Sequence, residues 1–353
     1  MATLARAFDA EVCLYVQDGE GDETVPDGYR IVDTGPRRAR LSRMSRGAWR
    51  MIGAVRRARP AIAHFHDPEL LPWAVLLRLY GIKVVYDVHE DVPRQIQHNM
   101  RLHPLLRRAL SPLVSLVEWC AARLLSAVVT ATPEIAARFP ARKTVIVANY
   151  PMIEEFVEPG REPMAERDRT FVYIGGLTRL RGLFSMTEAI ERLGESGACL
   201  RLAGDFVKEE ERDALAASPG WTQVRYEGWV NRAEVGKILS TARAGLVTLL
   251  PIRNYIEARP IKLFEYMAAG LPVIASDFPR WRDIVEGSQC GILVDPTDAE
   301  AIASAMRWIL DHPDEAQDMG VRGRQAVLDR YNWNSQAENL VTLYRSLLND
   351  RTI

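Results

Sequence analysis

Charged side chains gather in residues 255–276, YIEARPIKLFEYMAAGLPVIAS, around the start of a predicted helix. Lys262 lies in the first turn of that helix and Arg259 just before it, where the helix end already carries roughly half a positive charge. Cations there are destabilising unless an anion lies among them, and a bound phosphate would supply one. Glu257 and Glu265 bracket the site, and their carboxylates can accept hydrogen bonds from sugar hydroxyls.

The helix that positions these groups has recognisable ends. Pro260 suits its first position, because the missing N–H costs nothing there. Gly270 ends the helix, Pro272 prevents its continuation, and residues 273–275 are predicted to form a buried strand. We therefore expect Glu257 in a loop before the helix and Glu265 on its second turn.

A second turn can also approach a phosphate. Residues 170–174 are predicted to form a strand, and the sequence GGLTRLRG follows it directly. Gly175 and Gly176 allow the backbone to come close to a ligand. Arg179 and Arg181 can bind a diphosphate through charge-assisted hydrogen bonds.

The two segments together resemble the donor site of glycosyltransferase family 4, a set of nucleotide-sugar transferases. Glu257 and Glu265 have the E-x7-E spacing, and EYMAAGLPVIASDFPRWRDIVE is similar to the family's donor segment. The glycine turn is similar too, although Gly176 stands where many members have arginine, and Arg181 where many have lysine. The resemblance covers about residues 12–348. It implies the GT-B fold, an α/β architecture with two Rossmann-like, doubly wound parallel-sheet domains facing a cleft.

The chemistry implied by the resemblance needs cations but no metal. Breaking the bond from sugar to diphosphate builds negative charge on the leaving phosphate, which arginine, lysine and a helix N-terminus can stabilise. The family's acceptor-side histidine is similar to His89 in VHED. We predict four catalytic residues: His89, Glu257, Arg181 and Lys262. The predicted donor-binding residues are Gly175, Gly176, Arg179, Arg181, Gly204, Lys262, Leu263 and Glu265. We expect no metal and no cofactor, with a nucleotide-diphosphate sugar as the donor substrate.

The length of 353 residues suits two domains. We predict an N-terminal acceptor-side domain over residues 1–155, a polar linker over residues 156–169 and a nucleotide-sugar-binding domain over residues 170–330. Residues 331–353 have apolar positions at helical spacing. In a GT-B protein this helix would cross back to the first domain; the alternative is a packing helix of the second domain.

The first residues depart from the family pattern. Residues 1–10 are typical of the second half of an amphipathic helix, and residues 11–16 of the strand that follows it. We therefore expect the first strand and its Gly-rich turn to be absent from this sequence.

Two polar clusters follow neighbouring predicted strands. Residues 61–65 precede His66-Asp67-Pro68-Glu69, and residues 82–88 precede His89-Glu90-Asp91. A strand–helix–strand unit is parallel, so both clusters leave the carboxyl edge of the sheet, where ligands bind.

The histidines of this region have two interpretations. We expect His64 in the core and Asp67 as the cap of a helix that begins at Pro68. The alternative is a metal site. Its possible ligand sets are His64, His66 and Asp67, or His89 with Glu90 and Asp91, and no further set converges by spacing.

Residues 37–59 contain nine arginines and no acidic residue, together with an apolar stripe that includes Trp49, Ile52 and Val55. Such a segment can lie on an anionic membrane surface, and many relatives use lipid-linked acceptors there. The alternative is a helix that buries its apolar side and solvates its arginines. Further along, residues 101–125 are helical and apolar, and we expect Pro104 and Pro112 to break them.

The composition limits the classes of protein. A formal net charge of −1 gives no overall field for nucleic acid, and four widely spaced cysteines suit a reducing compartment. No apolar run is long enough to span a membrane. We predict a cytoplasmic glycosyltransferase, peripheral at the inner face of the membrane, that transfers a sugar with retention to a glycan or glycolipid in surface-polysaccharide assembly. The alternatives are a nucleotide-sugar epimerase on the same fold and a non-catalytic nucleotide-sugar-binding protein.

Overall fold

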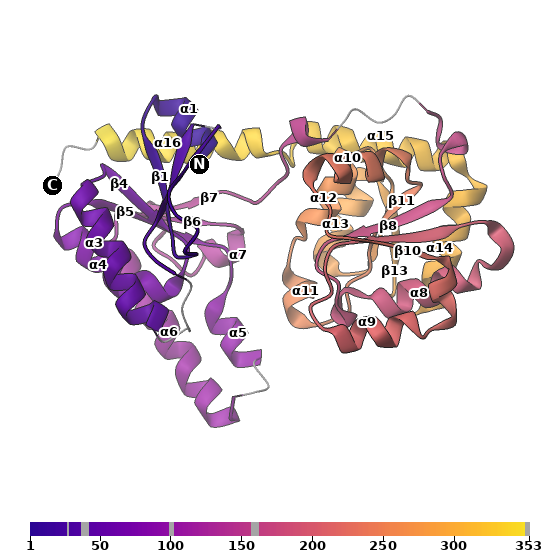
Figure 1. Ribbon diagram of the computed structural model, residues 1–353, viewed down its shortest axis with the longest axis horizontal. Helices are drawn as coiled ribbons and strands as arrows, with labels where there is room; N and C mark the ends of the chain where they lie inside the picture. The colour runs from indigo at the N-terminus through magenta and orange to yellow at the C-terminus, as the bar shows by residue number, and fades with distance from the viewer. Residues whose placement is uncertain (27, 37–41, 99–101, 157–161, 350–353) are drawn as a thin grey trace. The chain divides into compact units, whose positions relative to one another are not determined.

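The computed structural model describes residues 1–26, 28–36, 42–98, 102–156 and 162–349. The chain forms two compact units (Figure 1). Unit 1 comprises Met1–Asn149 and Asn334–Ile353, and unit 2 comprises Tyr150–Trp333. Each unit has a parallel β-sheet with helices packed against it, which confirms the predicted α/β class with two parallel-sheet domains.

Unit 1 contains two sheets. Strands β4, β5, β6 and β7 lie in that order and are all parallel. A separate sheet has the order β1-β3-β2, in which β1 and β3 are parallel and β2 is antiparallel. The strands are β1 (Val12–Val16), β2 (Glu23–Val25), β3 (Tyr29–Asp33), β4 (Ile62–Phe65), β5 (Lys83–Val88), β6 (Ala127–Thr130) and β7 (Thr144–Ile146).

The helices of unit 1 bury a stripe of apolar residues against the four-stranded sheet, and its core includes Ile52, Val55, Leu77 and Val84. The helices are α1 (Ala2–Phe8), the π-helical turn η1 (Arg43–Gly47), α3 (Ala48–Ala58), η2 (Pro68–Leu70), α4 (Leu71–Leu79), α5 (Val92–His98), α6 (Pro104–Leu124), α7 (Pro133–Ala136), η3 (Ala141–Lys143) and α16 (Trp333–Asn349). Ile52 and Val55 thus belong to the core, which is the second interpretation of the arginine-rich segment. Residues 37–41 of that segment lie outside the described residues.

The C-terminal helix α16 packs on unit 1. The hydroxyl of Tyr344 lies 2.7 Å from Nδ1 of His64. The side chain of Gln336 accepts a hydrogen bond from the backbone N–H of Ala148 at 2.9 Å. Lys83 of β5 donates to the carbonyl of Leu347. These contacts make the last helix part of the first unit.

Unit 2 has one six-stranded parallel sheet with the order β10-β9-β8-β11-β12-β13. Its central strands are buried along their whole length, as expected for a sheet covered on both faces. The strands are β8 (Thr170–Ile174), β9 (Cys199–Ala203), β10 (Val224–Gly228), β11 (Ala244–Val247), β12 (Val273–Ser276) and β13 (Gly291–Val294). Numbered from β8, this is the strand order 3-2-1-4-5-6 of dinucleotide-binding folds, so the strand order reverses between β8 and β11.

The helices of unit 2 cover both faces of this sheet with two apolar clusters. They are η4 (Ile153–Glu155), η5 (Met164–Glu166), η6 (Arg179–Arg181), α8 (Leu183–Arg192), η7 (Gly194–Ser196), α9 (Glu209–Ala216), η8 (Pro219–Gln223), α10 (Arg232–Thr241), α11 (Arg253–Glu257), α12 (Ile261–Ala268), α13 (Pro279–Ser288), α14 (Ala299–Asp311) and α15 (Pro313–Asp329). Polar caps fix several helix starts. Asn231 and Glu234 form a capping box on α10, and Asp298 caps α14. Phe156 and Met164, on either side of the undescribed residues 157–161, are buried in the core of this unit.

Three local predictions were wrong. Pro112 does not break α6, which continues through it while packing against α4 and α5. The side chain of Asp67 caps nothing, and Pro68 begins a short 3-10 turn. Pro260 precedes α12 in an extended conformation and is not its first residue.

Candidate functional site

The reversal of strand order in unit 2 places its candidate ligand site. In open parallel sheets ligands bind outside the carboxyl ends of the strands at this point. The turn 175–182 follows β8, and α11 and α12 follow β11. The two segments predicted from the sequence therefore meet at one edge of one sheet.

Backbone packing at this edge requires glycine at two positions. Gly204 has a φ of 127°, and a Cβ atom there would lie 2.0 Å from the carbonyl oxygen of Gly175. Gly182 has a φ of 83°, and a Cβ atom there would lie 2.0 Å from the carbonyl oxygen of Thr248. Gly176 differs, because a Cβ atom there would contact nothing within 4 Å. The turn is thus held against β9 and β11, which leaves Gly176 exposed at its tip.

Lys262 brings α12 to this turn. Its Cε lies 3.6 Å from the position that a Cβ atom on Gly175 would take. Its Nζ donates to the carboxylate of Glu265 at 2.6 Å. Lys262 lies at the helix N-terminus, where a cation is unfavourable, and its position predicted a bound phosphate. Its charge is already paired with Glu265 of the same helix. A phosphate that binds here has to compete with Glu265 for Lys262.

Glu265 is only 3% exposed and joins two cations. Arg232, at the start of α10, lies 3.2 Å from its other carboxylate oxygen and 3.4 Å from a carboxylate oxygen of Glu155. Arg232 was not predicted from the sequence, because it lies at the connection between β10 and α10, outside the two segments that predicted the donor site. A carboxylate accepts up to about four hydrogen bonds, so Glu265 retains capacity for ribose hydroxyls beside its two ion pairs.

Arg181 is held by two aromatic residues. Its guanidinium lies 5.3 Å from the ring centroid of Tyr255 on α11. Its positive charge also lowers the pKa of the nearby Tyr173 hydroxyl, which burial raises to about 12. Arg179 instead stacks on Phe184 at 3.6 Å and remains exposed, and its backbone N–H donates to Glu211. Arg181 is therefore the less exposed of the two arginines.

Glu257 is the last residue of the short helix α11 and not a loop residue. Its carboxylate lies 3.2 Å from Nε of Arg253. Arg280 and Trp281 of α13 donate to the carbonyls of Glu257 and Ala258 at 2.9 and 2.8 Å. The backbone that presents Glu257 is thus fixed by α13.

The side chain of Leu263 is fully buried in the core, so this predicted donor-binding residue can offer a ligand only its backbone. Its N–H already donates to the carbonyl of Pro260 at 3.1 Å.

Unit 1 brings three histidines around one carboxylate. Oδ2 of Asp87 lies 3.1 Å from Nε2 of His64, 3.3 Å from Nδ1 of His66 and 3.4 Å from Nε2 of His89. We refer to Asp87, His64, His66 and His89 as the histidine cluster. Strand pairing explains it: His64 pairs with Val85 in the parallel ladder, so alternate residues of β4 and β5 share one face. On the opposite face, Phe65 stacks on Tyr86.

The structure places these residues differently from the prediction. His64 is not an apolar core residue, since it bonds Asp87 and Tyr344. The ligand set was also assigned wrongly, because the converging acid is Asp87 inside the strand. The one acidic residue of the apolar segment 82–88 was the available signal.

The other polar residues after β5 face elsewhere. Asp91 pairs with Arg138 at 3.0 Å, and Glu90 accepts a hydrogen bond from Gln95 at 2.6 Å. They do not join His89 in a ligand set.

Electrostatics bind the histidine cluster together. Burial of the Asp87 carboxylate would raise its pKa, but the hydrogen bonds from His64, His66 and His89 outweigh burial and hold the pKa well below its ordinary value. The hydrogen bond to Asp87 raises the pKa of His89, against an opposing effect of burial. His89 is therefore fixed by an ionised carboxylate, with 44% of its side chain exposed.

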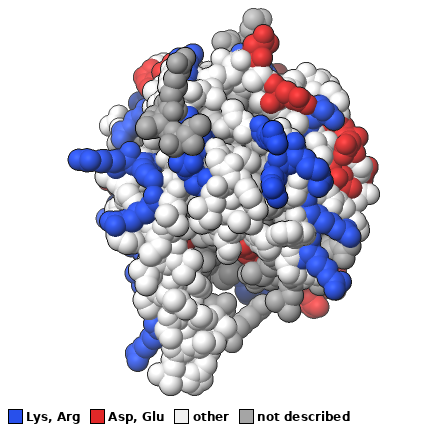
Figure 2. Space-filling view, turned by 90° about the vertical axis from the view of Figure 1, so that its left-hand side faces the viewer, with Lys and Arg blue, Asp and Glu red and all other residues white. Residues whose placement is uncertain are grey.

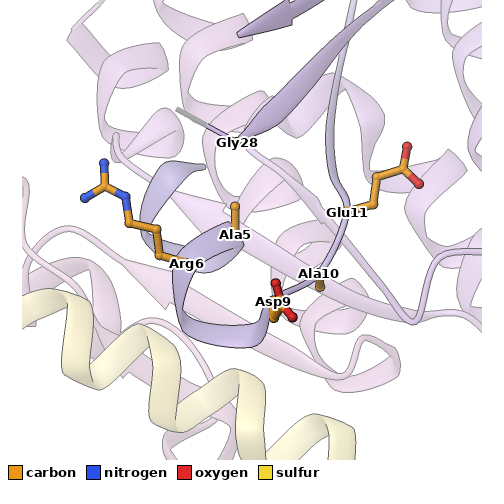
Figure 3. Close-up of a pocket in the computed structure, with 6 residues that line it drawn as sticks. All are labelled: Ala5, Arg6, Asp9, Ala10, Glu11 and Gly28. Carbon is orange, nitrogen blue, oxygen red and sulfur yellow. The ribbon is translucent and has the colours of Figure 1, made fainter. Parts of the chain in front are cut away.

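A hollow near the N-terminus does not belong to either site. It is lined by Ala5, Arg6, Asp9, Ala10, Glu11 and Gly28. Figure 3 shows the side chains of Arg6 and Glu11 pointing in opposite directions, so these charged groups do not converge on a ligand.

The comparisons with known proteins agree with this geometry. Residues 1–149 match the family description "Glycosyl transferase 4-like domain", and residues 155–326 match "Glycosyl transferases group 1". The chain belongs to the family 4-like glycosyltransferases and has the GT-B fold.

Curated relatives include a glycogen synthase of Mycobacterium tuberculosis (strain CDC 1551 / Oshkosh), 24% identical over 83% of this chain and 70% of that protein. An alpha-D-kanosaminyltransferase of Streptomyces kanamyceticus is 24% identical over 77% of this chain and 73% of that protein.

Solved structures with this fold include sucrose-phosphate synthase from Thermosynechococcus elongatus. It has a TM-score of 0.77 and 19% identity, over 98% of this chain and 91% of that one. Anabaena HepE, solved in complex with UDP, has a TM-score of 0.70 and 13% identity, over 98% of this chain and 94% of that one. The protein is therefore a glycosyltransferase that uses nucleotide-sugar donors.

Proposed function

We propose that this glycosyltransferase binds its donor diphosphate between the turn 175–182 and the N-terminus of α12. The supporting observation is that Lys262 and the Gly175 backbone come together where the strand order reverses. Arg181 adds a second cation on the same side of the sheet. These groups, together with the helix N-terminus, would stabilise the charge that builds on the leaving phosphate.

Donor binding would exchange one ion pair for others. In the described structure the ammonium of Lys262 is bonded to Glu265. A donor phosphate would draw Lys262 towards itself, while Glu265 would keep Arg232 and accept the ribose hydroxyls. Glu257, fixed by α13, would hold sugar hydroxyls and so orient the anomeric carbon.

His89 is our candidate for the acceptor side in unit 1. Its ring is oriented by Asp87, which fixes the nitrogen that faces the carboxylate. We propose transfer with retention to a glycan or lipid-linked acceptor in surface-polysaccharide assembly. Family membership favours this transfer over epimerisation of the donor or binding without catalysis.

We also propose contact with an anionic membrane at the cytoplasmic face. No helix among the described residues is long and apolar enough to cross a membrane. Helix α6 exposes a stripe of apolar side chains at helical spacing: Leu106, Leu113, Leu116, Val117 and Leu124. Arg123 stacks on Trp119 of the same helix, and Arg56 of α3 stacks on Tyr80.

Exposed apolar side chains among cations suit the interface of an anionic bilayer. Figure 2 looks at this side of unit 1 and shows an uncharged area in its lower half with Lys and Arg side chains along the margins. Because Ile52 and Val55 are buried, α6 replaces the apolar stripe of residues 37–59 in this proposal.

The transfer reaction itself tests the proposed function. The protein would be incubated with UDP-, GDP-, ADP- and TDP-sugars and a lipid-linked sugar acceptor, and release of nucleoside diphosphate would be measured. We expect acceptor-dependent release with one base, and a product whose anomeric proton coupling matches the donor. Accumulation of an epimerised donor without acceptor would instead support the epimerase. A product with inverted anomeric configuration would refute retention.

A further inference from the structure

The histidine cluster of unit 1 has the donor atoms of a metal site. Three of them form a nearly equilateral triangle: His66 Nδ1 and His89 Nε2 are 3.1 Å apart, and Oδ2 of Asp87 lies 3.3 and 3.4 Å from them. Nε2 of His64 approaches the same oxygen at 3.1 Å. Tetrahedral Zn²⁺ with bonds of about 2.0–2.1 Å separates neighbouring ligand atoms by roughly 3.3–3.4 Å. The triangle therefore has nearly the edge lengths of such a coordination shell.

Hydrogen bonding alone does not account for these distances. A neutral imidazole has one nitrogen that donates and one that accepts. If His66 Nδ1 and His89 Nε2 both carried protons, two donors would face each other across 3.1 Å. If only one of these nitrogens carries a proton, at least one of the three contacts in the triangle has no proton between its atoms. A cation above the triangle would satisfy all three atoms at once.

The carboxylate supplies an independent observation. Asp87 is 9% exposed and comes from the middle of the sheet. Within the part of the chain that the structure describes, its Oδ1 is buried without a hydrogen-bond partner. An unpaired buried carboxylate oxygen costs free energy, and a cation that Asp87 binds through both of its oxygens would offset that cost.

The second ring nitrogen of His64 also has a contact that is typical of histidines in metal sites. Its Nδ1 lies 2.7 Å from the hydroxyl of Tyr344 on α16. Histidines that ligate a metal through one nitrogen usually bond a second group through the other, which fixes the tautomer and the ring orientation. Tyr344 would hold Nε2 of His64 towards Asp87.

We propose that Asp87, His64, His66 and His89 form a binding site for one divalent transition-metal cation of the Zn²⁺ type. Imidazole nitrogens favour zinc and its neighbours over Mg²⁺ or Ca²⁺, which prefer all-oxygen ligands. All four residues belong to unit 1, and the proposal does not depend on how the donor binds. The cation would take Nε2 of His89 and leave Nδ1 as the ring nitrogen open to an acceptor.

The full chain, freed of metal with a chelator, would be titrated with ZnCl₂ by calorimetry near neutral pH. We expect one tight site per chain. His66→Asn should weaken binding at least tenfold, since even partners outside the ligand shell are worth 10- to 100-fold in metal affinity. His66 is exposed, so this variant should fold. The control is His103→Asn, because His103 caps α6 outside the cluster and asparagine can keep the cap.

Two further measurements separate the cluster from other metal ligands. Tyr344→Phe should weaken Zn²⁺ binding by about 10- to 100-fold if the tyrosine orients a ligand. Co²⁺ bound at the cluster should show the visible bands of four-coordinate nitrogen and oxygen ligation. A thiolate-to-cobalt band would place the metal at a cysteine and overturn the proposal. Equal Zn²⁺ affinity of the wild type and His66→Asn, or no tight site in the wild type, would overturn it as well.

Discussion

The donor site of unit 2 and the histidine cluster of unit 1 are built in opposite ways. The donor site takes Gly175, Arg181, Lys262 and Glu265 from two continuous segments, each with its own recognisable turn or helix start. The histidine cluster takes its residues from β4, β5 and the connection after each, and its orienting tyrosine from α16. The donor site can be recognised from the order of residues along the chain. The histidine cluster can be recognised only once the register of β4 against β5 is known.

The two sites also differ in how charge is satisfied. Each charged group of the donor site already has a partner, so the site functions by exchanging partners with a phosphate. In the histidine cluster, ring nitrogens of His66 and His89 lie 3.1 Å apart, and among the described residues Oδ1 of Asp87 has no hydrogen-bond partner. In the donor site the cations are already paired, which suits a ligand that binds and dissociates. In the histidine cluster nitrogen and oxygen lone pairs converge, which suits a permanently bound cation.

The largest expected effect is on the leaving-group cations of unit 2. Arg181→Ala should cost about 2–4 kcal/mol of transition-state stabilisation, or roughly 30- to 1000-fold in kcat/KM. The matched control is Arg192→Ala, which removes an exposed arginine paired with Glu188 and Glu300 in the same unit. Steady-state kinetics with the preferred donor measure both. Turnover of Arg181→Ala within about twofold of the control would remove Arg181 from the mechanism.

The glycine turn offers a comparison within the donor site. Gly204→Ala would place a methyl group 2.0 Å from the carbonyl of Gly175 at a positive φ, so we expect a loss of stability of about 1–3 kcal/mol or more, with weaker nucleotide binding. Gly176→Ala has open space and should leave stability within about 0.5 kcal/mol. Denaturant unfolding of the two variants measures the difference. Equal stabilities would show that the turn is not packed as described.

Membrane contact would distinguish the surface of unit 1 from that of unit 2. The triple change Leu113→Ser, Leu116→Ser and Val117→Ser removes three exposed apolar side chains from one face of α6. It should lower partition onto vesicles with anionic lipid by at least about tenfold, because each buried side chain is worth up to about 1.5–3 kcal/mol. Vesicle flotation measures this, with the exposed Val321→Ser of unit 2 as control.

Charge also contributes to this partition. Replacing Arg37, Arg38, Arg40 and Arg43 with glutamate should weaken binding to anionic vesicles only. Partition that neither change affects would contradict the membrane proposal.

The smallest effect concerns a buried carboxyl of unit 1. Burial raises the pKa of Glu118, while Arg138 and Tyr86 partly oppose burial. A raised pKa means that Glu118 contributes fully to stability below its unfolded pKa of about 4.3, and that this contribution is lost as pH rises through the folded value. Relative to Glu118→Gln, the wild type should therefore lose stability as pH rises above about 4.3. Denaturant unfolding across pH tests this, with the exposed Glu90→Gln as control; a constant difference would contradict it.

The sequence predicted the fold and the elements of the donor site because their signals are local. Proline, glycine and periodicity mark the ends of α12 and β12 within a residue or two. The sequence could not show that Lys262 pairs with Glu265, since the three-residue spacing is equally compatible with an unpaired lysine that binds a phosphate. It also could not show Arg232, which reaches Glu265 from another connection.

In unit 1 the sequence failed where the contacts span the sheet. His64 was assigned to the core, and His66 stands beside Asp67, which was assigned to capping, because each role has a local explanation. Their convergence on Asp87 follows from the register of β4 against β5, which sets His64 beside Val85. Pro112 is a related case, because packing around α6 overrides a strong local signal.

The central claim is that the β8 turn and the start of α12 form a nucleoside diphosphate site. The most direct measurement is a calorimetric titration with UDP, GDP, ADP and TDP in the presence of a chelator. We expect one clear binder among the four nucleotides, and weaker binding of that nucleotide to Lys262→Ala and Glu265→Gln. Equal binding by the wild type and both variants, or no binding of any nucleotide, would contradict it.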